Sequence, residues 1–312
     1  MLKIKGIGGE FELINRIKNK IKLYSKDVIA GIGDDAAVLK YDKNNYILFT
    51  TDTLCQNNHF SLKYSTAQQI GMKAIEQNAS DIAAMGGIAK FALVSLALPN
   101  KNKKSVEFID GIYDGINKKS KKYGISIVGG NITFSKEIAI NIALIGTVEK
   151  KYLALRSNAK TGDLIFCTGD VGKSAAGLEL LKLGLKGKSV KKHLEPECKL
   201  DLARKLVKVG INSMIDVSDG VASEVGHICE QSNKGAVIYS DKIPISKDTI
   251  ADSKKVDKNP LDFALYGGED FELIFTAGKN RMAKLKKYDA TVIGEIVGKK
   301  YGVRVMKNHI KD

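Results

Sequence analysis

The amino-acid sequence predicts an α+β fold, with helices and strands mixed along the chain and arranged in about two domains. The 312 residues exceed the length of one typical domain. Hydrophobic residues make up 44% of the chain and there are only four prolines, which favours a packed globular protein over a disordered or fibrous one. Strand and helix patterns follow one another without strict βαβ alternation, so α+β is favoured over a doubly wound parallel sheet.

The first expected domain covers residues 1–150 and combines buried strands with amphipathic helices. Helices are predicted at residues 67–85 and 105–123, and strands at 46–52, 91–99, 125–131 and 138–149. In the second helix, apolar side chains between Val106 and Ile116 recur at helical spacing and share one face. Glycines follow both helices, as is typical of helix ends.

The second expected domain covers residues 151–312 and begins with a polar turn followed by a strand within 154–170. Helices are predicted at 174–184, 197–210 and 221–232, and strands at 236–240, 271–277 and 292–297, with a short helix between the last two strands. A glycine turn, YGGED, precedes the alternating strand FELIFTA.

The net charge of +15 raises the possibility that nucleic-acid binding is the main role. However, the lysines are dispersed, with only short runs such as KNKK and KKSKK, and aromatic residues do not interleave with them. A lysine-rich solvated surface is the simpler interpretation, because a basic patch alone indicates little about a partner. We therefore expect no nucleic-acid partner.

Targeting signals and soft-metal sites are not predicted. The longest uncharged stretches, such as FALVSLALPN, fall well short of the roughly 20 apolar residues of a membrane helix. The start, MLKIKGIGGEF, contains no apolar signal-peptide core. The four cysteines and four histidines are scattered singly, without zinc-ligand spacing. We therefore expect a cytoplasmic protein with no membrane partner and reduced thiols, in which any metal is a hard cation.

Two stretches resemble nucleotide-binding loops but depart from them. Residues 172–174 (GKS) match the end of a P-loop, yet Cys167 stands where its first glycine is required. Residues 31–33 (GIG) match the start of a dinucleotide fingerprint, but Asp34 and Asp35 would place negative charge where phosphate should bind. Phosphate could approach this second loop only with cations between them.

Acidic residues concentrate in the glycine-rich and hydroxyl-rich turns. Any one such aspartate is more often a cap or turn residue than a ligand. Their number and the neighbouring hydroxyls nevertheless favour oxygen coordination of Mg²⁺ ions that bridge the phosphates of ATP. Such a site favours phosphoryl transfer, and an acceptor that is itself a phosphate needs no general base. The acids are Asp34, Asp35, Asp52, Asp81, Asp216, Asp219, Glu269 and Asp270.

Nine motifs extend the pattern along nearly the whole chain. They are GGEFELINRI, GIGDDAAVL, TTDTLCQNNHF, NASDIAAMGG, GGNIT, LRSNAKTGD, TGDVGKSAAGLELL, IDVSDGVASEVGHI and YGGEDFELIFT. In this order and spacing they resemble the thiamine-monophosphate kinase family, of the ATP-binding superfamily that includes aminoimidazole ribonucleotide synthetase. The resemblance implies that superfamily's two-domain fold and a homodimer. It also implies direct in-line transfer of the ATP γ-phosphate to thiamine monophosphate, giving thiamine diphosphate, with several Mg²⁺ ions.

The resemblance also implies roles for individual residues. The metal ligands it implies are Asp35, Thr50, Thr51, Asp52, Asp81, Asp216 and Asp219. The ATP contacts it implies are Tyr113, Gly130, Asn131, Arg156 and Ser218, and the contacts to thiamine monophosphate are His59 and Glu269. No catalytic side chain is expected because the metal ions assist the transfer. The role of Asp34 is left open.

The sequence departs from the family pattern at three places. Asn131 replaces the aspartate of the usual GGD, which removes one negative charge at a metal position, and Phe271 replaces a usual tyrosine. The sequence reaches Asp312 without the glycine-aromatic-x-His-Phe segment that helps close over the substrate in many members. A second hypothesis, an ATP-sensing or basic binding protein with a relic site, therefore stands beside the kinase.

Overall fold

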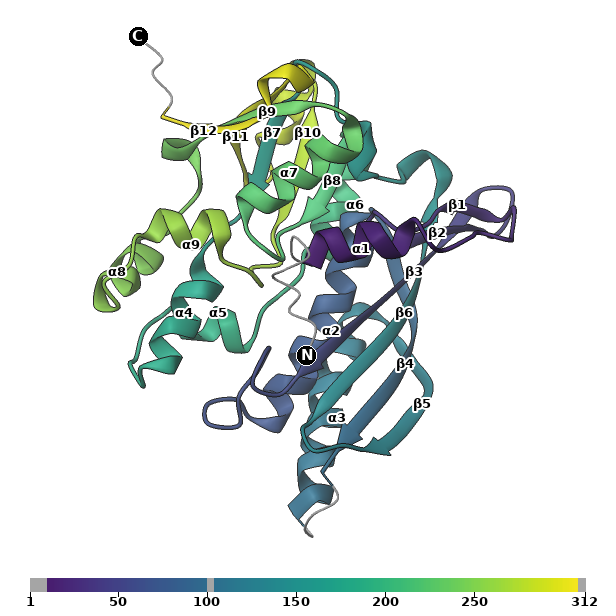
Figure 1. The fold of residues 1–312 in the computed structure, drawn as a ribbon, viewed down its shortest axis with the longest axis vertical. Helices are drawn as coiled ribbons and strands as arrows, with labels where there is room; N and C mark the ends of the chain where they lie inside the picture. The colour runs from purple at the N-terminus through teal and green to yellow at the C-terminus, as the bar shows by residue number, and fades with distance from the viewer. Residues whose placement is uncertain (1–9, 100–103, 308–312) are drawn as a thin grey trace.

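Two six-stranded sheets organise the chain (Figure 1). The structure, a computed structural model, describes residues 10–99 and 104–307. The first sheet has the order β1 (Val28–Ala30), β2 (Ala37–Lys40), β3 (Asn45–Cys55), β6 (Ala139–Glu149), β4 (Ile88–Leu98) and β5 (Ser126–Phe134). The second has the order β12 (Val303–Met306), β9 (Gly235–Tyr239), β11 (Ala290–Val297), β7 (Leu164–Thr168), β10 (Leu273–Ala277) and β8 (Ser213–Asp216).

The pairing within both sheets is mainly antiparallel. Among the described strands, β4 pairs with β5 and β9 with β12 in parallel, and the other neighbours are antiparallel. This pattern confirms the predicted α+β class, because a doubly wound fold requires mostly parallel neighbours.

Helices of the first half pack on one face of the first sheet (Figure 1). They are α2 (Ala67–Ala84) and α3 (Lys104–Tyr123), with α1 (Glu10–Lys18) nearer β1 and β2. Helix α2 begins at Thr66, whose hydroxyl accepts the Gln69 N–H at 3.2 Å while the Gln69 side chain accepts the Thr66 N–H at 3.0 Å. The two long helices touch at glycines, since a Cβ on Gly71 or Gly115 would lie 2.0 Å from a carbonyl oxygen of the other helix. These contacts fix α2 in place.

Shorter helices surround the second sheet. They are α4 (Lys173–Lys182), α5 (Val190–Leu194), α6 (Leu200–Val209), α7 (Val221–Ser232), α8 (Lys247–Lys255), α9 (Pro260–Tyr266) and α10 (Met282–Leu285). Helix α7 packs against strands β8 and β9, whereas α4, α5, α8 and α9 form a separate group beside it (Figure 1). Helix α6 packs against α2 and so joins the two halves.

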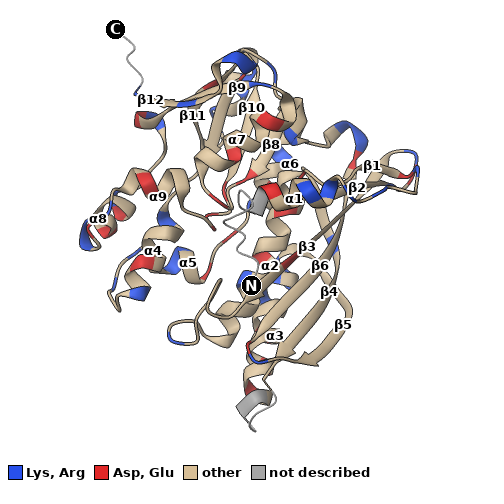
Figure 2. Cartoon of the chain, viewed as in Figure 1, with Lys and Arg blue, Asp and Glu red and all other residues tan. Residues whose placement is uncertain are grey.

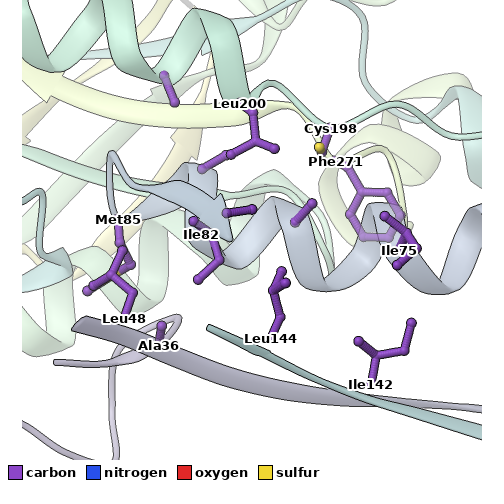
Figure 3. Close-up of a cluster of buried hydrophobic side chains, with 14 of the residues drawn as sticks. Ala36, Leu48, Ile75, Ile82, Met85, Ile142, Leu144, Cys198, Leu200 and Phe271 are labelled. Atoms are coloured by element: carbon purple, nitrogen blue, oxygen red, sulfur yellow. The ribbon is translucent and has the colours of Figure 1, made fainter. Parts of the chain in front are cut away.

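Helix α2 lies inside one continuous apolar core. In Figure 3, Ile75 and Ile82 of α2 lie between Leu144 of the first sheet and Leu200 and Phe271 of the second half. All five side chains belong to the same buried cluster. The polar residues of α2 are therefore held at fixed positions relative to both sheets.

Most elements predicted from the sequence are present. The helices at 67–85, 105–123 and 221–232 are confirmed to within a few residues. The elements that were not predicted are helices α1, α5, α8 and α9 and strands β1, β2, β8 and β12. Residues 8 and 9 of the first motif and residues 308–312 of the tail lie outside the described residues. Among the described residues, every helix is too short or too polar to span a membrane.

The outer face of the first sheet carries exposed apolar side chains. Phe49, Ile145 and Phe91 lie opposite one another on β3, β6 and β4. Phe49 is 43% exposed, Phe91 is 49% exposed and Leu93 is 47% exposed. Apolar side chains gathered in this way are typical of a surface that is covered by a partner.

Candidate active site

A cavity of about 1160 Å³ opens between the two halves of the chain. Its walls come from the loop after β1, strand β3, helix α2, the loop after β8, helix α7 and the turn before β10. Acidic side chains line it: Asp34, Asp35, Asp52, Asp81, Asp216, Asp219, Glu224, Glu230 and Glu269. Figure 2 shows acidic segments meeting in this region, beside α2 and below β8. The cavity is thus strongly acidic although the chain as a whole is basic.

Three aspartates from distant parts of the sequence converge at its base. Asp35 follows β1, Asp81 lies in the last turn of α2, and Asp216 ends β8; one carboxylate oxygen of each lies within 4.8 Å of the others. Hydroxyls orient two of them, since Thr50 donates to Asp81 at 2.5 Å and Ser80 donates to Asp216 at 2.6 Å. We call Asp35, Asp81 and Asp216 the aspartate triad.

The aspartate triad fits a divalent cation. Burial, followed by the charge of Asp35, raises the pKa of Asp216 to about 7. Burial, followed by the charge of Asp52, raises the pKa of Asp81 well above its ordinary value. Carboxylates that repel one another in a buried site are ionised together when a cation lies between them. The all-oxygen donor set matches the preference of Mg²⁺.

Strand β3 brings three of the predicted ligands to the cavity. Because successive side chains of a strand point to opposite faces, Thr50 and Thr51 diverge. The Thr50 hydroxyl contacts the aspartate triad, whereas the Thr51 hydroxyl accepts a hydrogen bond from Asn141 at 3.0 Å. The N–H of Asp52 donates to Asn78 of α2 at 3.1 Å, and burial raises the pKa of Asp52.

Asp34 and Asp35 are held by Arg156 in different ways. The Arg156 guanidinium donates to both carboxylate oxygens of Asp35, at 2.6 and 3.3 Å. Asp34 instead accepts the backbone N–H groups of Arg156 and Asp35, each at 3.1 Å. Burial, followed by the charge of Asp35, raises the pKa of Asp34 to about 7. Asp34 therefore fastens the loop, and Asp35 presents its charge to the cavity.

The loop after β8 is shaped by a buried glutamate that the sequence did not single out. Glu224 of α7 accepts the N–H of Asp219 at 2.7 Å and the N–H of Ser218 at 3.2 Å. Ser218 donates its hydroxyl to Asp216 at 2.9 Å. The position of Glu224 in the first turn of a predicted helix was the available signal, because acidic residues there often satisfy free backbone N–H groups.

The cavity lining also includes His59 and Glu269. The Nδ1 atom of His59 accepts the Cys55 N–H at 3.0 Å, which fixes the imidazole at the end of β3. Glu269 and Phe271 have left-handed backbones, with φ of +66° and +49°. Each such non-glycine conformation costs on the order of 1–3 kcal/mol and is typical of sites where geometry serves function.

The turn that contains Glu269 is anchored by Asp270. Its carboxylate accepts the N–H groups of Gly172 at 2.5 Å and Ser174 at 2.8 Å, at the start of α4. Burial raises the pKa of Asp270 to about 7. A protein carboxylate thus occupies the place where the P-loop-like residues 172–174 would hold phosphate. Likewise, β2 rather than a helix follows residues 31–33, so neither stretch is a nucleotide loop of the type it resembles.

Known proteins are similar in sequence to this chain over nearly its whole length. The family model of the AIR synthase related protein N-terminal domain matches residues 33–148, and that of the C-terminal domain matches residues 160–307. The thiamine-monophosphate kinase of Buchnera aphidicola subsp. Schizaphis graminum is 38% identical over 97% of this chain and 95% of its own. That of Bacillus subtilis is 38% identical over 89% of this chain and 86% of its own. The chain belongs to the thiamine-monophosphate kinase family.

Solved structures of thiamine-monophosphate kinases show the same fold. A structure described as "AaThiL complexed with AMPPCP and TMP" is 35% identical, covers 100% of this chain and 98% of its own, and has a TM-score of 0.87. Thiamine monophosphate kinase from Aquifex aeolicus is 32% identical, covers 97% of this chain and 98% of its own, and has a TM-score of 0.81. The predicted two-domain fold of the superfamily is therefore confirmed.

Most of the residues implied by the resemblance to thiamine-monophosphate kinases line the cavity, but three do not. The lining residues are Asp35, Thr50, Thr51, Asp52, His59, Asp81, Arg156, Ser218, Asp216, Asp219 and Glu269. Tyr113 packs on α3 against the core, away from this cavity. Gly130 lies in register with Asp52 across β4 and β6, three strand spacings or roughly 14 Å away. Asn131, the next residue, shares that separation.

Proposed function

We propose that this chain transfers the γ-phosphate of ATP to thiamine monophosphate in line, giving thiamine diphosphate and ADP as a step of thiamine diphosphate biosynthesis. The convergence of the aspartate triad with His59 and Glu269 around one cavity carries the proposal. Relatives named thiamine-monophosphate kinase, and a structure described with AMPPCP and TMP, support it. We also propose a cytoplasmic location, as the sequence predicts.

Several Mg²⁺ ions are part of the proposal. The residues that would hold them are Asp35, Thr50, Thr51, Asp52, Asp81, Asp216 and Asp219. When bound, the ions would neutralise the phosphate oxygens between donor and acceptor. The chain itself contributes the fixed carboxylates, which Thr50, Ser80 and Arg156 hold in place before any ligand arrives.

No side chain needs to act as a general base, because the acceptor is already an anionic phosphate oxygen. The described residues instead position the two substrates. Arg156 and Ser218 lie at the acidic end of the cavity, where the phosphates of ATP would bind. His59 and Glu269 line the same cavity and are joined through Lys73, and thiamine monophosphate would bind beside them.

A homodimer would explain the residues outside the cavity. Gly130 and Asn131 lie three strands from Asp52 and outside the lining of this cavity. The exposed Phe91 and Leu93 lie on β4, between β6 and β5, and offer an apolar surface for a second copy. We propose that pairing through this face brings Gly130 and Asn131 of one copy toward the nucleotide of the other.

The proposal is tested by supplying purified protein with ATP and Mg²⁺ and comparing acceptors. Thiamine monophosphate should yield equal amounts of thiamine diphosphate and ADP, whereas unphosphorylated thiamine should yield neither. If ATP binds but no acceptor is phosphorylated at any magnesium concentration, the relic-site hypothesis replaces the kinase. Production of ADP without thiamine diphosphate would indicate a different acceptor.

A further inference from the structure

A buried lysine links the two substrate residues. Lys73 lies in α2, and its side chain is 4% exposed. Its ammonium donates to the Glu269 carboxylate at the Oε2 atom, at 2.7 Å, and to the backbone carbonyl of His59 at 2.9 Å. Residues 59 and 269 belong to opposite halves of the chain, so Lys73 fastens together two turns that nothing in the local sequence connects.

We infer that Lys73 is a positioning residue for thiamine monophosphate, because it fixes the carboxylate of Glu269 toward the cavity. The inference rests on the proposed function. Lys73 contacts the Oε2 atom and Glu269 lines the cavity, so its carboxylate is presented as an acceptor for a donor group of the thiamine moiety. Without Lys73, Glu269 would lose its ammonium partner.

The burial of Lys73 is not explained by stability alone. Burial lowers the pKa of the ammonium, and the charge of Glu269 opposes that shift. Replacement of buried ion pairs by apolar side chains of similar volume is often neutral or stabilising. A methionine at position 73 would therefore suffice for packing, and the charged pair serves the geometry of the site.

Helix α2 connects this lysine to the metal end of the cavity. Lys73 and Asp81 are eight residues apart on one helix, which corresponds to roughly 12 Å along its axis. Thiamine monophosphate carries its pyrimidine ring and its phosphate at opposite ends. One rigid helix thereby sets the distance between the residues that hold each end.

His193 connects Glu269 to the P-loop-like residues 172–174. The Nδ1 atom of His193 lies 3.4 Å from Glu269 Oε2 and 3.1 Å from the Ser174 hydroxyl. The same Ser174 donates its backbone N–H to Asp270. Residues 172–174, which the sequence analysis left without a role, thus brace the turn that presents Glu269, and Lys73 braces it from the other side.

The inference is tested with Lys73→Met and a matched control, Lys119→Met. Lys119 forms a similar buried pair with Glu76 of α2, at 2.6 Å, but lines no part of the acidic cavity. We expect Lys73→Met to raise the KM for thiamine monophosphate about tenfold or more, the size typical of a lost charge-assisted hydrogen bond. The KM for ATP should stay within about twofold, and Lys119→Met should change neither KM by more than that.

A double variant shows whether Lys73 acts through Glu269. We expect Lys73→Met combined with Glu269→Gln to have the same KM for thiamine monophosphate as Glu269→Gln alone. If Lys73→Met does not fold, Lys73→Gln is measured in its place with the same expectation.

Three outcomes would overturn the inference. The first is an unchanged KM for thiamine monophosphate in an active Lys73 variant, and the second is an equal rise in both KM values. The third is additive effects in the double variant. A wild-type protein without kinase activity overturns the proposed function, and the inference with it.

Discussion

Substitution of Asp81 is the most direct test of the aspartate triad. Burial and the neighbouring carboxylates raise the pKa of Asp81 well above its ordinary value, which favours its neutral form in the metal-free protein. Asp81→Asn keeps the shape and an acceptor for the Thr50 hydroxyl, which lies 2.5 Å away. We therefore expect the free energy of unfolding of metal-free protein to change by less than about 1 kcal/mol.

The effect should appear when magnesium is added. A cation at 100 times its Kd stabilises the native state by about 2.7 kcal/mol, which corresponds to roughly 4 °C in Tm for a chain of this size. Paired thermal melts with and without Mg²⁺ should show this shift in the wild type and little of it in Asp81→Asn, together with weaker ATP binding. An equal magnesium shift and equal ATP affinity in both proteins, or a metal-free variant that melts far below the wild type, would refute the shared-metal site.

Two further perturbations test other parts of the molecule. The pKa of Asp270 is raised from 3.8 to about 7, so its contribution to stability is full below pH 4 and is lost as the pH rises through 7. In urea unfolding, the free energy of unfolding of the wild type should fall by on the order of 4 kcal/mol between pH 4 and 8 because of Asp270, and Asp270→Asn should lack this fall. The same dependence of the free energy of unfolding on pH in both proteins would contradict the assignment. Leu93→Glu should leave the fold intact, because Leu93 is 47% exposed. Light scattering should show a monomer, and the kinase assay should show little activity. A dimeric, active Leu93→Glu protein would exclude this face as the interface.

Local patterns single out the members of the aspartate triad. Asp35, Asp81 and Asp216 each stand beside glycine or hydroxyl residues near the ends of helices or strands, and functional side chains often lie at such positions. Their convergence still depends on the pairing of strands far apart in the sequence, which no local pattern specifies. The resemblance to a known family supplied that arrangement in advance.

Residues whose role depends on long-range burial were missed. Lys73 lies within an amphipathic helix and resembles a surface lysine until Glu269, 196 positions later, packs against it. Glu224 likewise shows its function only where the loop after β8 folds back onto α7. Asn131 could be placed on a strand but not beside the cavity, because its distance from Asp52 follows from the strand order of the sheet.

The central claim is direct transfer between two bound phosphates, and the fate of the γ-phosphate tests it most directly. With γ-labelled ATP, Mg²⁺ and thiamine monophosphate, the label should appear in the terminal phosphate of thiamine diphosphate in equal amount to ADP, and only when all three are present. Label released as inorganic phosphate, or retained in ATP, would contradict the account.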